Sequence, residues 1–289
     1  MATSQTKESI LERIVSTLGE LPASPAIVST VMGLTSNPDS KVVDISKVLS
    51  VDQSLTAKVL KLSNSSFYGR PKAVKTLQDA ILLLGFFTVR SIVIATSAHT
   101  MYTKEASSGP QEKLWQHSLA TAVAARQIAQ RIRHPAKDEV FIAALLHDIG
   151  KLVLLQKLTE KYLEIVTEVE DTGGRFIDVE ADRLGFTHCE VAAILLDHWQ
   201  FPQSLKEAVL DHHDPAPAQD DEPLPISHII CLGNEMAKHL EVGFDDAQAE
   251  SMAGVESARL MGLDEETLQN ILQETEEYYH IETSIFEEQ

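Results

Sequence analysis

The residues of this chain that could do chemistry are histidines and aspartates, and the adjacent pair His147 and Asp148 is the most informative of them. The pair lies in the apolar run Leu145 to Ile149, whose pattern predicts burial in a helix. Burying two such groups without partners is costly, so we expect something to satisfy them. Imidazole nitrogens and carboxylate oxygens are ligands of zinc, iron and manganese, and a metal ion is the leading candidate.

Histidines elsewhere in the chain could complete this site. The candidate ligands are His117, His147, Asp148, His188, His212 and His213. Each histidine alone has an ordinary explanation, because a buried histidine is more often a hydrogen-bonded core residue and a histidine at a helix end can lie in solvent. The set taken together favours metal binding. The other histidines, His99, His134, His198, His228, His239 and His280, are interpreted as structural.

One long helix over Asp138 to Leu155 is predicted to carry the pair. In such a helix Asp148 projects about 100° further round than His147, so both reach one ion only if it lies over the seam between them. The two carboxylate oxygens could also bridge two ions. Gly150 is expected to permit close packing. Lys151 could contact a phosphate group, or it could lie in solvent at a helix end.

The charge of the chain limits its partners. The chain has 24 basic and 43 acidic residues, which give a formal net charge of −19 over 289 residues. Such a charge repels phosphate backbones and predicts no nucleic-acid partner. A small phosphorylated ligand stays possible, because a bound cation inverts the local field. The two cysteines, Cys189 and Cys231, have no short spacing and indicate a reducing compartment.

The segment Ala80 to Ala98 is apolar and long enough to cross a membrane. However, Arg90 lies near its centre, where insertion costs about 2.5–3.5 kcal/mol. Gly85 indicates a break between two shorter buried helices. Residues Met1 to Glu20 are polar rather than signal-like. We therefore expect a soluble, cytoplasmic protein without a membrane partner.

Nearly every periodic segment has helical spacing, which predicts an all-α fold. Residues 1–105 are expected to form an N-terminal bundle of short helices, and residues 110–289 a second helical region after a polar linker from Thr103 to Pro110. Helix caps are predicted at Ser24-Pro25, Asp52, Thr76 with Asp79, and Thr187. Longer helices are predicted over Gln111–Arg133, Asp138–Leu155, Ile226–Leu240 and Leu263–Tyr279.

Four blocks of the first hundred residues resemble the HDOD domain, a bacterial helical module related to HD-type metal-dependent phosphohydrolases. The blocks are Leu21-Pro22 through Pro25, Asp52 through Leu55, Leu62 through Gly69, and Asp79 through Gly85. The resemblance extends from Leu21 to His213. It implies an N-terminal bundle of short helices packed on an HD-domain-like helical bundle, and a role in signalling or regulatory output. Many members have lost the metal ligands and have no established catalytic activity.

This chain keeps more of the ancestral site than those members. His117, His147-Asp148, His188 and His212-His213 match, in order, ligand positions of the HD-GYP branch, which hydrolyses cyclic di-GMP. The resemblance implies a two-metal centre bridged by Asp148. Two departures weaken it: Asp214-Pro215-Ala216-Pro217 stands in place of the GYP signature, and Asn234 stands at the last ligand position. An amide is a neutral and weaker ligand than a carboxylate.

Three functions remain open at this point. The first is a signal-transduction module with a retained metal site that acts through a regulatory protein partner. The second is a metal-dependent phosphohydrolase resembling cyclic dinucleotide phosphodiesterases, in which Lys151 neutralises phosphate. The third is an iron-based redox or oxygen sensor. In all three we expect one or two divalent ions, with iron favoured and zinc or manganese as alternatives.

Overall fold

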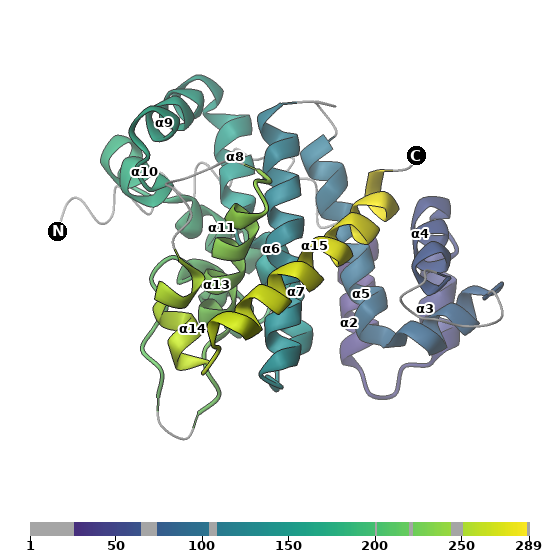
Figure 1. Cartoon of the computed structure of the whole chain (residues 1–289). Coiled ribbons are helices and arrows are strands. Elements are labelled where there is room, and N and C mark those ends of the chain that lie inside the picture. Colours follow the sequence, from purple (N-terminus) through teal and green to yellow (C-terminus); the bar gives the residue numbers. More distant parts are fainter. Residues whose placement is uncertain are drawn as a thin grey trace. The chain divides into compact units, whose positions relative to one another are not determined.

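The computed structural model describes residues 26–64, 74–103, 109–199, 201–219, 222–243 and 251–287. Throughout these ranges the secondary structure is helical, without a strand, so the predicted all-α class is confirmed (Figure 1). Several predicted features lie outside the described residues. They are the polar N-terminus Met1 to Glu20, the Leu21 to Pro25 block with its Ser24-Pro25 cap, residues 65–69, and residues 104–108 of the linker.

The chain divides into two compact units. Among the described residues, one unit holds Tyr102–His280, and the other holds residues 26–101 together with residues 281–287. The predicted domain boundaries, 1–105 and 110–289, stay a prediction.

The smaller unit contains α2 (Ala26–Ser36), α3 (Val42–Leu49), α4 (Gln53–Ser63) and most of α5 (Leu77–Thr103). Two predicted caps are confirmed here. The Asp52 carboxylate accepts a hydrogen bond from the Leu55 amide at 3.0 Å, and the Thr76 hydroxyl accepts one from the Asp79 amide at 3.1 Å. These bonds satisfy amide groups that a helix leaves open at its first turn.

Helix α5 is the one described helix long and apolar enough to cross a membrane, but 50% of its most apolar window is buried inside the protein. Gly85 interrupts it with φ +79° and ψ 160°, as the sequence predicted. Only glycine adopts such a backbone conformation without steric cost. Half of the most apolar window of α5 thus packs against other parts of the protein, and the cytoplasmic location stays a prediction.

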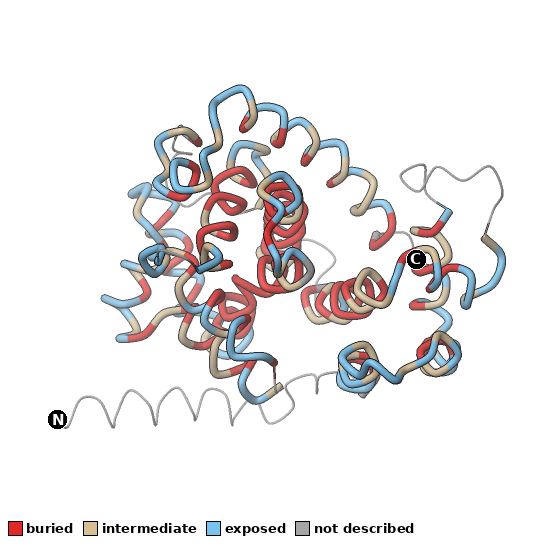
Figure 2. The backbone as a smooth tube through the Cα atoms, turned by 90° about the horizontal axis from the view of Figure 1, so that it is seen from below, coloured by how far each residue is buried: buried red, intermediate tan, exposed pale blue. Residues whose placement is uncertain are grey.

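The larger unit is built around two mutually packed helices, α6 (Pro110–Arg131) and α13 (Ile226–His239). Helix α6 is buried along most of its length, partly through small alanines, and Figure 2 shows such buried helices at the centre of the unit. Gly233 of α13 lies against the backbone of Thr121 and Ala125. Small side chains on both helices therefore allow their close approach.

The other helices of this unit complete its framework. They are α7 (Lys137–Leu146), α8 (Ile149–Lys157), α9 (Thr159–Thr172), α10 (Phe176–Leu184), α11 (His188–His198), α12 (Gln203–Leu210), the short η2 (Met252–Gly254), α14 (Glu256–Leu260) and most of α15 (Glu265–Glu287). The predicted cap of α11 is confirmed, because the Thr187 side chain accepts from the Glu190 amide.

The predicted single helix from Asp138 to Leu155 is wrong. The chain leaves the helix at His147 and Asp148, and Asp148 has φ −100° and ψ 10°, so that α7 and α8 are separate helices. The reason is local: the His147 ring nitrogen Nδ1 bonds to the Ala144 carbonyl at 2.6 Å, whereas the His147 amide lies 3.5 Å from the same oxygen. A side chain that competes for a backbone carbonyl weakens the helix at that point. Because of this turn, the side chains of His147 and Asp148 are not held at the offset of about 100° that a continuous helix would impose on adjacent residues.

Gly150 permits the close packing that the sequence suggested. A Cβ atom there would collide with the His188 carbonyl oxygen and would lie 2.8 Å from the carbonyl carbon. The first turn of α8 therefore lies directly against the start of α11, and both of these segments carry candidate ligands.

We expect Gly150→Ala to destabilise the protein by about 1–3 kcal/mol, because an added methyl group would force these two backbones apart. The measurement is the free energy of unfolding in urea. Gly33→Ala is the matched control, since Gly33 lies in α2 with open space around it and should become slightly more stable. Equal stability of Gly150→Ala and wild type would contradict the close packing.

Candidate metal centre

The structure brings all six predicted ligands together in the larger unit. His117 comes from α6, His147 and Asp148 from the turn between α7 and α8, His188 from the first residue of α11, and His212 and His213 from the segment after α12. All are buried except His213, which is half-buried. Their role as metal ligands stays a prediction, but their convergence is a fact of the fold.

Asp148 lies between two groups of histidines. Its Oδ2 atom is 3.4 Å from Nε2 of His147 and 3.8 Å from Nε2 of His117. Its Oδ1 atom is 3.2 Å from Nε2 of His188 and 3.9 Å from Nε2 of His212. Each carboxylate oxygen therefore faces its own pair of imidazoles, and this arrangement can hold one ion or two.

Hydrogen bonds on the far side of two rings fix which nitrogen faces the centre. Nδ1 of His147 bonds to the Ala144 carbonyl at 2.6 Å, and Nδ1 of His212 bonds to the Val209 carbonyl at 2.7 Å. A carbonyl can only accept, so each Nδ1 carries a proton, and in the neutral ring each Nε2 has a lone pair that faces the centre.

Three buried atoms at the centre make no hydrogen bond in the described part of the chain: Nε2 of His147, Nε2 of His212, and Oδ1 of Asp148. All three are electron-pair donors. Buried polar atoms are nearly always satisfied, so this convergence indicates a position for a cation.

Glu180 on α10 is a buried carboxylate behind the candidate site that the sequence analysis missed. It is fully buried, and its Oε2 accepts hydrogen bonds from Nδ1 of His188 at 2.6 Å and from the His188 amide at 2.7 Å. Its Oε1 accepts from the Tyr162 hydroxyl at 2.6 Å. A carboxylate behind a ligating histidine orients the ring and makes it a stronger ligand. The only signal in the sequence is that Glu180 follows the apolar Phe176 by four residues, a spacing that places both on the same face of a helix.

Lys151 lies inside the site rather than in solvent, so the alternative of a solvated lysine is wrong. It is 4% exposed, and its Nζ lies 2.9 Å from Oδ2 of Asp148 and 4.5 Å from the centre of the Phe176 ring. Burial by itself raises the pKa of Asp148, but the neighbouring His147 and Lys151 outweigh it and hold this pKa well below its usual range. Asp148 is therefore an anion at the centre of the cluster.

Asn234, the candidate that replaces an aspartate, also reaches the cluster. Its Oδ1 lies 2.7 Å from Nε2 of His117. With the amide oxygen as acceptor, the imidazole carries its proton on the nitrogen that faces Asp148. A metal ion bound by His117 would have to replace this hydrogen bond. The position served by His117 is therefore the weaker half of the centre.

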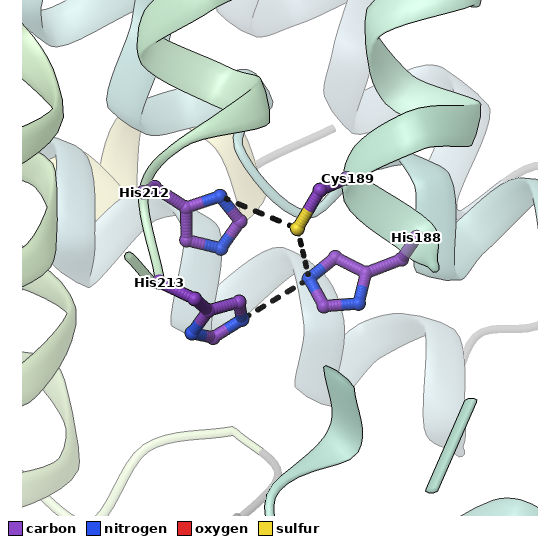
Figure 3. Close-up of side chains that lie close together, drawn as sticks. All are labelled: His188, Cys189, His212 and His213. Atoms are coloured by element: carbon purple, nitrogen blue, oxygen red, sulfur yellow. Dashed lines mark hydrogen bonds between the residues drawn. The ribbon is translucent and has the colours of Figure 1, made fainter. Parts of the chain in front are cut away.

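Cys189 is a further neighbour that the sequence analysis did not consider as a ligand. It follows His188 on α11, it is buried, and its sulfur lies 3.4 Å from Nε2 of His188 (Figure 3). The sequence signal that could have identified Cys189 is its position directly after the candidate ligand His188.

Two of the histidines interpreted as structural have such roles in the structure. His134 bonds to the Leu224 carbonyl at 2.8 Å, and His228 bonds to Ser257 and to the Ala216 carbonyl, both at 2.9 Å. These contacts lie away from Asp148 and need no ion.

Histidines gathered around one buried aspartate in a helical unit are the arrangement that the resemblance to HD-type proteins implied. In a comparison with known protein families, the model of the HDOD domain matches residues 21–215. The match covers more than half of the chain, so this protein belongs to the HDOD domain family.

Solved structures of several bacterial proteins share the fold. An HDOD domain protein of unknown function from Geobacter sulfurreducens has a TM-score of 0.80 and 24% identity over 98% of both chains. A candidate phosphohydrolase from Shewanella amazonensis SB2B has a TM-score of 0.70 and 24% identity over 91% of this chain and 93% of its own. A candidate signal transduction protein from Marinobacter aquaeolei VT8 has a TM-score of 0.76 and 22% identity over 99% of this chain and 66% of its own.

A curated relative from Treponema pallidum (strain Nichols), itself uncharacterised, is 23% identical over 243 residues, which are 83% of this chain. This chain spans 45% of the length of that relative.

The environment of His212 predicts a dependence of stability on pH. Burial and the neighbouring His147 hold the pKa of His212 well below 6.5. As the pH falls below 6.5, the unfolded chain binds a proton at this position that the folded chain does not bind, so folding stability falls. Between about pH 7.5 and about pH 5.5 this single group should remove on the order of 1 kcal/mol of folding stability.

The measurement is urea unfolding of chelator-treated protein at both pH values, with His212→Gln beside wild type. The difference between the two proteins isolates the effect of His212 from that of His188. Burial lowers the pKa of His188, but Cys189 and Glu180 outweigh burial and raise it. His188 therefore adds folding stability as the pH falls, which is the opposite of the effect of His212. The assignment fails if wild type and His212→Gln lose stability equally on acidification.

Proposed function

We propose that this HDOD protein is a bacterial signal-transduction module that retains a divalent metal centre and acts through contacts with a regulatory protein partner. One observation carries the metal centre: lone pairs of His147, His212 and Asp148 converge in a buried space without a hydrogen-bond partner among the described residues. The similarity of the fold to a candidate signal transduction protein supports the regulatory role.

Burial of the centre favours regulation over catalysis. His117, His147, Asp148, His188 and His212 are each at most 4% exposed. A phosphodiester substrate would have to reach an ion held among them, and Lys151 is already paired with Asp148. An ion in such a closed position instead stabilises one arrangement of α6, α8 and α11, and a partner protein can recognise that arrangement.

We propose iron as the ion, because several imidazoles and one carboxylate suit it, with zinc and manganese as the other ions that this ligand set accepts. Bound iron would also allow the redox or oxygen sensing considered above. The acidic composition does not favour a nucleic-acid partner. We propose a regulatory protein as the partner and the cytoplasm as the location.

Elemental analysis of protein purified without a metal-affinity tag tests the centre. We expect one or two divalent ions per chain in wild type and none in His147→Ala/Asp148→Ala, because this pair removes donors from both halves of the centre. His198→Ala, which changes an exposed histidine, is the control and should keep full occupancy. Wild type without metal after anaerobic reconstitution with iron, zinc or manganese would refute the metal centre.

A second function, metal-dependent phosphohydrolysis, is favoured by the position of Asp148. Its two oxygens face separate groups of histidines, which is the arrangement needed for two ions to act on one phosphate. The fold is also shared with a candidate phosphohydrolase. In this mechanism the ions would lower the pKa of a bound water and polarise the phosphoryl oxygen, and Lys151 would neutralise the phosphate.

A measurement of phosphodiester hydrolysis decides between the regulatory and the hydrolytic function. The regulatory proposal predicts that metal-loaded wild type hydrolyses cyclic di-GMP and a generic phosphodiester no faster than metal-loaded His147→Ala. The measurement is product release at equal protein concentration, with His198→Ala as the control. A wild-type rate clearly above that of His147→Ala would replace the regulatory proposal with the hydrolytic one.

A further inference from the structure

We infer that Cys189 is a sulfur ligand of the metal centre and forms, with His188, His213 and Asp148, a four-donor site for one ion. The inference rests on the proposed metal centre and goes beyond it, because the centre was predicted from histidines and carboxylates alone. Figure 3 shows the Cys189 sulfur pointing toward the His188 ring, while His213 approaches the same ring from another side.

The three distances from Nε2 of His188 to the other proposed donors are close to the edges of a tetrahedral site. Around Nε2 of His188 lie the sulfur of Cys189 at 3.4 Å, Nε2 of His213 at 3.2 Å, and Oδ1 of Asp148 at 3.2 Å. A tetrahedral ion with bonds of about 2.0–2.1 Å to nitrogen and about 2.3 Å to sulfur separates its ligands by about 3.3–3.6 Å. Three edges of the expected tetrahedron are therefore present.

The orientation of His188 supports the same assignment. Glu180 holds Nδ1 of this ring at 2.6 Å, so Nε2 is the nitrogen that faces the other three donors and would coordinate an ion once its own proton is released. Asp148 adds an independent sign of a ligand, because its Oδ1 is buried and makes no hydrogen bond to any described group.

His212 lies near Cys189 but is not one of the four proposed donors. The Cys189 sulfur also lies 3.8 Å from Nδ1 of His212, but that nitrogen is occupied by the Val209 carbonyl at 2.7 Å. Its available nitrogen, Nε2, lies toward Asp148 instead. The donor set around Cys189 is therefore His188, His213 and Asp148.

A sulfur ligand narrows the choice of ion. Thiolate is a soft donor that suits zinc and iron, whereas manganese and magnesium prefer oxygen donors. When the ion binds, the thiol proton is released to solvent and the sulfur coordinates as thiolate. In the absence of an ion, the same thiol can donate a weak hydrogen bond to Nε2 of His188, so the experiment must separate coordination from a hydrogen bond.

Cobalt(II) in place of the native ion provides that separation. In full-length wild type loaded with cobalt, we expect a near-ultraviolet thiolate-to-cobalt charge-transfer band beside the weaker visible bands of the ion itself. Cys189→Ser should lose the charge-transfer band and bind cobalt at least about tenfold more weakly. Cys231→Ser, which changes the other cysteine of the chain, is the matched control and should keep both the band and the affinity.

X-ray absorption of zinc-loaded wild type gives a measurement that needs no variant. We expect one sulfur scatterer at about 2.3 Å from zinc. Visible cobalt bands without a charge-transfer band, or zinc bound only by nitrogen and oxygen, would overturn the role of Cys189 and leave the proposed metal centre intact. A wild-type protein that binds neither ion would refute the metal centre itself.

Discussion

The structure of the larger unit depends on one buried negative charge, the carboxylate of Asp148. A carboxylate without counter-charges is too costly to bury, so the surrounding helices must supply partners. Lys151 satisfies one oxygen at 2.9 Å, whereas the other oxygen faces imidazoles without a hydrogen bond to the described residues. This asymmetry distinguishes the site from an ordinary buried ion pair, because a pair that served stability alone would leave no donors unsatisfied.

The scaffold controls the site mainly through contacts behind the candidate ligands. The Ala144 and Val209 carbonyls and the Glu180 carboxylate each hold one Nδ1 atom, and each thereby turns the Nε2 atom of its histidine toward Asp148. Such supporting contacts fix the orientation of metal ligands before an ion binds. Gly150 contributes in a different way, because the absence of a side chain lets α8 approach the residue that opens α11.

The same geometry bears on both of the proposed functions, the regulatory one and the hydrolytic one. Both need the histidines and Asp148, but hydrolysis also needs access to the ion and a full set of anionic ligands. Here the ligands are buried, Asn234 is a neutral amide bonded to His117, and Lys151 is engaged by Asp148. These features favour an ion that organises helices over an ion that processes a substrate.

The sequence by itself determined the all-α class, the caps at Asp52, Thr76 and Thr187, the break at Gly85 and the residue types of the centre, because these follow from local periodicity and hydrogen-bonding capacity. It did not determine the turn at His147 and Asp148, since periodicity treats that apolar run as a continuous helix. It also could not place Glu180 behind His188 or Cys189 near His212. These contacts join residues from different segments of the chain, and only tertiary packing decides which buried side chains meet.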